Sequence, residues 1–290
     1  METNKNVFER YEKKYLLTNQ QYDSLMEYLH NKVHIDQYGE TTILNIYYDT
    51  PAFELIRKSL ERPVYKEKLR LRCYGTPNPE SPAFVELKKK YEGIVYKRRE
   101  CMTYEEATAF ILSPDFPNPT QVEKEISYFV KAHSPILPAM MIACERIAMV
   151  GNDDPELRIT FDRNIRYRKS DLELTHGSFG TPIIDDNSVL MEVKIKDALS
   201  AELAYVFSVL RIFPVSFSKY GTAYSYELRN TLSAHVPQPK IIKQKVRTKK
   251  NDRHIIQLDN REQHNHSAII LGGNNLFRSS GRAHRTALFP

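Results

Sequence analysis

Cysteine is scarce in this chain, and long apolar runs are absent. The 290 residues contain three isolated cysteines, Cys73, Cys101 and Cys144, which form neither a CxxC pair nor a Cys/His cluster. This spacing gives no zinc site and suits a reducing compartment, so we expect the thiols to be structural. Even the apolar stretch 140–150 is interrupted by Glu145 and Arg146, and it falls short of the length of a transmembrane helix.

The motifs of several common enzyme classes are also missing. The N-terminus has no hydrophobic signal region, and the sequence has no glycine-rich phosphate loop, Ser-His-Asp spacing or kinase signature. His30, His34, His133 and His176 stand in no metal-ligand spacing. We therefore expect a soluble, cytoplasmic protein without these catalytic devices.

Positive charge is concentrated in two parts of the chain. The formal net charge is +6, but residues 231–290 alone hold 11 Lys and Arg against 3 Asp and Glu. Residues 1–230 hold 31 against 33, and ten of those 31 cations lie between Lys66 and Arg99. We therefore expect a folded domain over 1–230 and a basic tail over 231–290, which lacks amphipathic periodicity and is expected to be disordered.

Several short segments alternate with a period of two between apolar and charged side chains. Lys68, Arg70 and Arg72 alternate with leucines, and comparable patterns occur at 10–15, 85–90, 157–162 and 191–195. Successive side chains of a strand point to opposite faces, so each segment has one apolar and one charged face. A half-exposed sheet would show the same alternation, but here the charged face is mostly Lys and Arg. The pattern predicts a barrel with a cationic interior, helices as outer cover and a polyanion as guest.

Strands and helices are expected in a mixed order, with an antiparallel meander over 65–101. A capping-box pattern at Thr18 to Gln21 predicts a helix start, and Asp49-Thr50-Pro51 is expected to cap a second helix. The predicted strands are 7–17, 42–48, 65–74, 83–91, 94–101, 140–150, 156–167 and 189–196, and the clearest further helices are 104–112, 121–133 and 199–212.

The cations of the charged faces suit a chain of phosphates. Arginine binds phosphate oxygens with two parallel hydrogen bonds, whereas lysine acts as a point charge. Many buried cations would repel one another, so interior acids are needed, and Glu12, Glu86 and Glu192 are the candidates. A divalent metal would bridge phosphate oxygens and one or two carboxylates.

Eight ordered motifs together resemble the catalytic domain of the vacuolar transporter chaperone (VTC) complex, a polyphosphate polymerase of the triphosphate tunnel metalloenzyme superfamily. The resemblance covers about residues 7–229 and leaves out the tail. The motifs are FERYEKKY at 8–15, YYDT at 47–50, KLRLRCYG at 68–75, FVELK at 84–88, CER at 144–146, LRITFD at 157–162, LMEVK at 190–194 and FSKYG at 217–221.

The resemblance implies an α+β fold built on an antiparallel eight-stranded β tunnel, closed as a barrel. It further implies a phosphotransferase that moves the γ-phosphate of ATP onto polyphosphate and releases ADP, with Mn²⁺ or Mg²⁺ as cofactor. Glu192 matches the metal-binding carboxylate, and Glu12 is a weaker, metal-adjacent match. The implied phosphate-binding and catalytic residues are Lys14, Arg70, Arg72, Lys88, Arg146, Arg158 and Lys219.

The sequence departs from the resembled proteins at two points. The hydrolase branch of the tunnel superfamily begins its first strand with Glu-x-Glu-x-Lys, whereas this chain has Arg10-x-Glu12-x-Lys14. One carboxylate for metal binding is thereby lost, which disfavours hydrolysis with two metals. The regulatory helical domain and membrane helices of the eukaryotic complex are not found in the sequence. Any translocation would therefore need a membrane-protein partner in trans, while ATP and polyphosphate are the expected ligands and no specific nucleic acid is expected.

Alternatives remain open at this point. The chain could be a tunnel-fold triphosphatase or a non-catalytic module that binds polyphosphate or nucleic acid, and Glu192 could be a structural salt-bridge partner. Tyr47 and Tyr48 are assigned to packing. Lys90 and Arg98 could face inward by register but lack a motif. The cations interpreted as surface charges are Lys66, Lys97, Arg99, Arg166 and Arg168.

Overall fold

The computed structural model describes residues 11–92, 94–114, 117–196 and 198–234. Most of the predicted basic tail, 235–290, lies outside these residues. One antiparallel sheet has the strand order β1-β9-β7-β6-β2-β3-β4-β5, with the short β8 paired to β7. The elements in chain order are β1 (Tyr11–Thr18), α1 (Asn19–Leu29), β2 (Val33–Asp49), α2 (Glu54–Leu60), β3 (Tyr65–Tyr74), β4 (Pro82–Tyr91), β5 (Ile94–Thr103), α3 (Tyr104–Leu112), α4 (Gln121–Ala132), β6 (Leu137–Gly151), β7 (Arg158–Arg168), the 3₁₀ turn η1 (Leu174–His176), β8 (Thr181–Pro182), β9 (Ser188–Ile195), α5 (Ala201–Val209) and α6 (Lys219–Ala234).

The α+β class, the antiparallel sheet of eight long strands and the meander over 65–101 are confirmed. In the meander, β3 pairs with β4 and β4 with β5, with Leu69 opposite Leu87 and Lys88 opposite Lys97. The strand β2 is longer than expected, because its first half, from Val33, pairs with the end of β6. The apolar face that alternation predicted is buried: Leu69, Leu71 and Leu87 are all fully shielded from solvent.

The sheet is strongly curled, and one ion pair demonstrates it. The Nζ atom of Lys88 on β4 lies 3.4 Å from Oε2 of Glu12 on β1. These strands are six positions apart in the sheet order. Neighbouring strands lie about 4.8 Å apart, so in a flat sheet β1 and β4 would be separated by roughly 29 Å. The charged faces of the two ends of the sheet therefore face each other across an interior.

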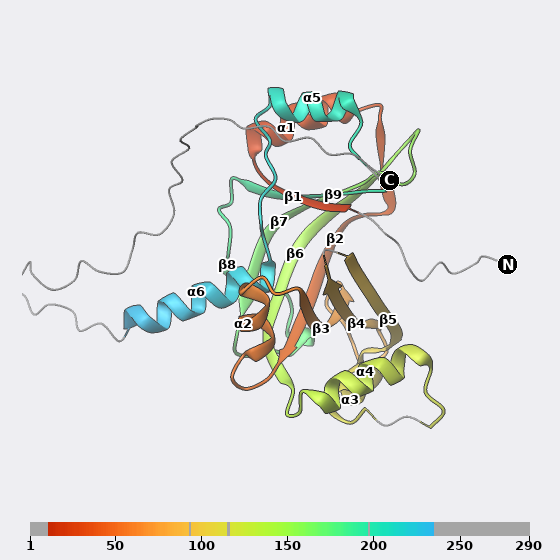
Figure 1. The fold of residues 1–290 in the computed structure, drawn as a ribbon, viewed down its shortest axis with the longest axis vertical. Helices are drawn as coiled ribbons and strands as arrows, with labels where there is room; N and C mark the ends of the chain where they lie inside the picture. Colours follow the sequence, from red (N-terminus) through yellow and green to blue (C-terminus); the bar gives the residue numbers. More distant parts are fainter. Residues whose placement is uncertain (1–10, 93, 115–116, 197, 235–290) are drawn as a thin grey trace, which may run out of the picture. The chain divides into compact units, whose positions relative to one another are not determined.

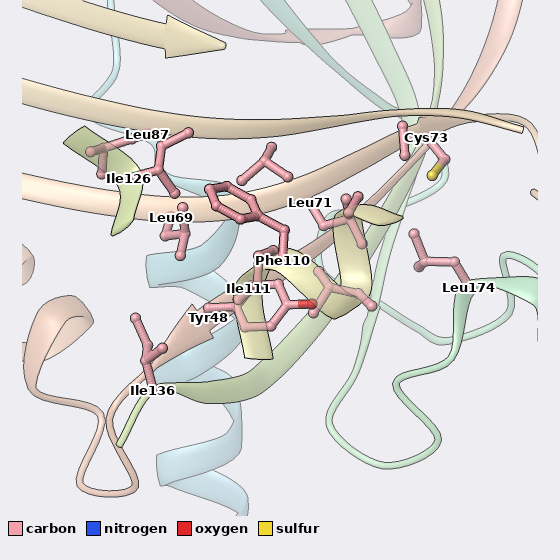
Figure 2. Packing of buried hydrophobic residues seen from close by; sticks show 14 of the residues in the cluster. Tyr48, Leu69, Leu71, Cys73, Leu87, Phe110, Ile111, Ile126, Ile136 and Leu174 are labelled. Carbon is pink, nitrogen blue, oxygen red and sulfur yellow. The ribbon is translucent and has the colours of Figure 1, made fainter. Parts of the chain in front are cut away.

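Helices cover the apolar outer face in two separate groups (Figure 1). Leucines of α1 and α5 pack with β1, β7 and β9, as Leu25 and Leu203 show. On the other half of the sheet, α3 and α4 cover β3 and β4. In that core Phe110 lies among Leu69, Leu71 and Ile111 (Figure 2). The predicted charged interior and outer helical cover are confirmed for these four helices, whereas α2 and α6 pack on the interior face, where Ile56 and Tyr220 join Tyr47.

The sheet differs from a closed barrel in its hydrogen bonds. Among the described residues, β1 pairs with β9 and β5 with β4, and no ladder joins β1 to β5. Part of the free edge of β1 is instead occupied by the segment that precedes α6. Tyr15 forms an isolated bridge with Pro214, and the Val215 amide donates to the Lys14 carbonyl at 2.7 Å. A closing strand could not use those groups as well.

Local hydrogen bonds explain where the helices begin. The predicted capping box at Thr18 is present, with the Thr18 hydroxyl accepting from the Gln21 amide and the Gln21 side chain accepting from the Thr18 amide. The buried Asp49 carboxylate accepts from the amides of Leu55 and Ile56 at 2.9 and 3.0 Å, so it caps α2 as expected. Asp49 also accepts from the hydroxyl of Tyr220, which ties α6 to the end of β2.

Candidate functional site

The interior face of the sheet collects the charged side chains that alternation placed there. Glu86 on β4 lies at the centre of one group and is 1% exposed. Its Oε2 accepts from Nε of Arg70 at 2.7 Å and lies 3.7 Å from Nε of Arg72. Its Oε1 accepts from Nε of Arg99 at 2.7 Å and lies 2.6 Å from Nζ of Lys97. One carboxylate on β4 thus holds four cations from the two flanking strands, β3 and β5.

The electrostatics of this group follow from the excess of cations. Burial favours the neutral acid, but Arg70, Arg72, Lys97 and Arg99 outweigh it and hold the pKa of Glu86 well below its usual range. Burial lowers the pKa of Lys97 to about 8, against the opposing attraction of Glu86. The group retains net positive charge and is suited to binding an anion.

A second group is centred on Asp162 of β7, which is fully buried. Its carboxylate accepts from Nε and Nη2 of Arg146 on β6 at 2.5 and 2.7 Å. It also accepts from Nζ of Lys219, the first residue of α6. Burial opposes the charged form, but Lys219 and Arg146 dominate and lower the pKa of Asp162. The two cations, from elements far apart in sequence, are therefore fixed beside each other.

Glu12, Lys14 and Glu192 form a third group between the other two. Nζ of Lys14 lies 3.3 Å from Oε1 of Glu12 and 3.8 Å from Oε2 of Glu192. Nζ of Lys194 lies 2.9 Å from the other oxygen of Glu192. Burial would raise the pKa of Glu192, but Lys194 and Lys14 hold it well below its usual range. The Glu12–Lys88 contact joins this group to the strands around Glu86.

Comparison with known proteins identifies the family. A model of the VTC domain matches residues 9–228. The chain belongs to the VTC-domain family. No curated protein sequence matches it.

The solved structures that this VTC domain resembles are distant from it in sequence. A candidate adenylate cyclase from Bacillus halodurans has 14% identity and a TM-score of 0.46, covering 73% of this chain and 95% of that chain. A candidate adenylyl cyclase from Hippeastrum, reported to have a dominant triphosphatase activity, has 15% identity and a TM-score of 0.45, covering 74% and 95%. The PH1819 protein from Pyrococcus horikoshii has 10% identity and a TM-score of 0.38, covering 75% and 99%.

Most of the site residues predicted from the sequence of the VTC domain lie in these three groups. Arg158 is the exception. It lies opposite Lys194 at the start of β7, is exposed, and has no ion-pair partner among the described residues. The structure therefore places Arg158 at the rim of the charged face. The residues brought together are Lys14, Arg70, Arg72, Lys88, Arg146 and Lys219 among the cations, and Glu12 and Glu192 among the acids.

Several interior residues were missed or misassigned by the sequence interpretation, among them Asp162 and Lys194 of the groups above. Lys97 and Arg99, interpreted as surface charges, both contact Glu86. Tyr47, assigned to packing alone, stacks on Tyr220 but also accepts from Nη1 of Arg70 at 3.2 Å. Lys68 lines the same pocket as Tyr47 and Arg70. The Lys-x-Arg-x-Arg alternation already contained the signal for Lys68, whereas Lys97 and Arg99 required the register of β5 against β4.

Other charge assignments were wrong for a local reason. Arg166 and Arg168 are 8% and 6% exposed, and their guanidinium groups are held mainly by the 171–179 segment and by Glu145. Arg98 points outward and donates to Glu125 at 3.0 Å, contrary to the inward position considered from its register. Its neighbours in sequence, Lys97 and Arg99, take the interior face, as the pleat requires.

The two predicted metal carboxylates fit a site that is shared with substrate. Glu12 and Glu192 both approach the same ammonium, that of Lys14, from adjacent strands. Within the described part of the chain, no group of three or more His, Cys, Asp or Glu side chains could hold a metal. Magnesium-type sites commonly use one or two carboxylates and take the remaining oxygens from phosphate and water. The two carboxylates therefore fit a hard divalent cation that takes its remaining oxygens from a phosphate ligand and water.

Proposed function

We propose that this VTC-family protein is a metal-dependent polyphosphate polymerase that transfers the γ-phosphate of ATP to a growing polyphosphate chain. The observation that supports this most is the convergence of cations from β1, β3, β4, β5, β6 and α6 on one interior face. Together with the VTC-domain match over 9–228, this favours a linear chain of phosphates over a single anionic group.

The proposed reaction needs positioning and charge more than covalent chemistry. A terminal phosphate oxygen of polyphosphate, or of orthophosphate, attacks the γ-phosphorus of ATP and forms a new P–O bond. The bond from the γ-phosphorus to the β–γ bridging oxygen breaks, and ADP leaves. Arg70 and Arg72, side by side on β3, would bind the equatorial oxygens, while Arg146 and Lys219 would bind a neighbouring phosphate. Fixed cations of this kind stabilise developing charge without reorganisation.

The metal would be held by Glu192 with Glu12 beside it. When bound, it would neutralise phosphate oxygens and strengthen the electrophilic character of phosphorus. Lys14 lies between these carboxylates. With metal and polyphosphate bound, its ammonium would offset part of the negative charge of the two acids and the phosphates.

The test is to incubate the full chain with ATP and Mn²⁺ and to analyse the products. Acid-labile polymer formed together with ADP supports the proposal. Free phosphate without polymer would indicate a triphosphatase, and neither product would indicate a non-catalytic binding module. Arg70→Ala should abolish most of the activity. Arg98→Ala is a matched control, because Arg98 lies on the outer face and pairs with Glu125.

The location of the protein and its partners are predicted from the sequence. No helix among the described residues is long and apolar enough to cross a membrane. The cytoplasmic location and the membrane-protein partner in trans stay predictions from the sequence.

A further inference from the structure

A pocket on the interior face contains one cation whose charge is not balanced by an acid. The pocket is lined by Tyr47, Lys68, Arg70, Glu86, Lys88 and Lys97. Arg70 and Lys97 bind Glu86, and Lys88 contacts Glu12. Lys68 has no carboxylate partner among the described residues. Its Nζ donates instead to the hydroxyl of Ser218, at 2.9 Å.

The surroundings of Lys68 are rich in hydrogen-bond donors. Tyr47 is fixed by stacking on Tyr220, with ring centroids 4.8 Å apart, and its hydroxyl accepts from Arg70. Burial and the neighbouring cations Lys14, Lys66 and Lys88 lower the pKa of Lys68 to about 8, although Tyr47 opposes them. An ammonium in this position is costly without a counter-charge, and an anion bound beside it would restore the balance.

We propose that Lys68, together with Tyr47 and Arg70, forms an additional subsite for one phosphoryl group of a linear inorganic polyphosphate. The subsite adds Lys68 and Tyr47 to the phosphate-binding residues that the resemblance implies. It rests on the proposed function, because it requires that the interior site binds polyphosphate. The bound group takes a hydrogen bond from Lys68, which releases Ser218, and shares the guanidinium of Arg70 with Glu86. Tyr47 holds that guanidinium in place and can donate its own proton to a phosphate oxygen.

A purely structural role for Lys68 is the rival explanation. In that case its hydrogen bond to Ser218 would only anchor the chain before α6, and substitution would change stability but not affinity. Lys66 provides a matched control. It lies two residues earlier on the same face of β3, donates to the Ser59 carbonyl at 3.4 Å, and is not part of the pocket lining.

The experiment is isothermal titration calorimetry of the full chain with inorganic triphosphate, at pH 7 in the presence of a chelator. A hydrogen bond to a charged group corresponds to a loss of roughly 10- to 100-fold in affinity when it is removed. Lys68→Met should show that loss, Lys66→Met should stay within about twofold of wild type, and Lys68→Arg should retain most of the binding. Melting temperatures of the unliganded variants report whether each remains folded.

The outcomes separate this inference from the proposed function. If wild type does not bind triphosphate, the proposed function fails. If wild type binds and Lys68→Met binds equally well, the subsite is refuted and the proposed function stands. If Lys68→Met does not fold, Lys68→Arg provides the test. Lys68 loses its proton between pH 7 and 9 and arginine does not, so triphosphate affinity should fall more steeply over that range in wild type than in Lys68→Arg. Tyr47, Lys14, Lys66 and Lys88 face Lys68 in both proteins, and Arg70, Glu86 and Lys97 line the same pocket in both. Identical pH profiles would therefore refute the subsite.

Discussion

Replacing Glu86 by Gln removes the one negative charge on which four interior cations converge. Glu86 is 1% exposed, and its oxygens lie 2.6 Å from Nη2 of Arg70, Nζ of Lys97 and Nη2 of Arg99. Removing one partner of a buried ion pair costs about 3–5 kcal/mol, because the remaining charge is left without compensation. Four cations lose their partner, but the side chains of Lys97 and Arg99 are 43% and 35% exposed, so water screens part of their charge. We therefore expect the loss of unfolding free energy to stay within that range.

The assay is thermal unfolding with and without inorganic triphosphate. For a folded unit of about this size, the loss corresponds to a fall in melting temperature of roughly 6–20 °C. Triphosphate should then stabilise Glu86→Gln more than wild type, because the anion supplies the missing negative charge. Glu125→Gln is the control, since Glu125 contacts Arg98 and Lys89 on the outer face and such a pair is worth about 1 kcal/mol or less. Equal destabilisation by the two substitutions, or equal stabilisation by triphosphate, would refute the reasoning.

Three further predictions concern single members of the three charged groups. Arg70→Ala and Arg72→Ala should each lower turnover by about 2–4 kcal/mol of transition-state stabilisation, and steady-state rates within a few-fold of wild type would remove them from the site. Glu192→Gln should raise the Mn²⁺ concentration for half-maximal rate, because a hard cation loses a charged ligand. A lower melting temperature with an unchanged metal midpoint would make Glu192 a salt-bridge partner only. Because the pKa of Asp162 is lowered in the folded state, its stabilising effect should be complete above about pH 4–5 and should fade as pH drops through the folded pKa. The difference in unfolding free energy between wild type and Asp162→Asn should therefore shrink between pH 5 and 2, and a constant difference would contradict the assigned pairing.

Alternation in the sequence was sufficient to predict which strands carry the charged face. Arg70, Arg72 and Lys88 could be assigned to it because the pleat fixes the direction of every second side chain. The partner of each charge could not be predicted in the same way. Glu86 meets Lys97 and Arg99 only because of the register between β4 and β5, and register depends on contacts that a single strand does not encode.

An irregularity in β7 turns Arg166 and Arg168 away from the interior face, and the 171–179 segment then buries them, which the surface assignment missed. The register between β6 and β7 shifts between Ala143 and Glu145, and Asn164 has a positive φ of 45°. Such a bulge exchanges the two faces of a strand. Beyond it, Ile165 and Tyr167 take the interior face, so the arginines are directed to the opposite side. Strict alternation extended from Asp162 cannot anticipate this.

The contact between Lys219 and Asp162 joins residues that are far apart in the sequence. Lys219 reaches Asp162 because α6 begins just after the segment that pairs with β1. The FSKYG motif predicted its involvement by resemblance alone. Its partner is set by the docking of α6, through the hydrogen bond from Tyr220 to Asp49.

Because Arg70 and Arg146 each already rest on a buried carboxylate, a polyphosphate bound as proposed would share each guanidinium with that acid. An isolated arginine would hold a phosphate tightly, and a row of such arginines would immobilise a long polyanion. Here the acid would stay in place and hold the guanidinium again when the phosphate departs. Each phosphate would then move to the next position with a small change in free energy. For the polymer that the proposed reaction makes, that property would favour steady forward movement of the product over arrest at any one point.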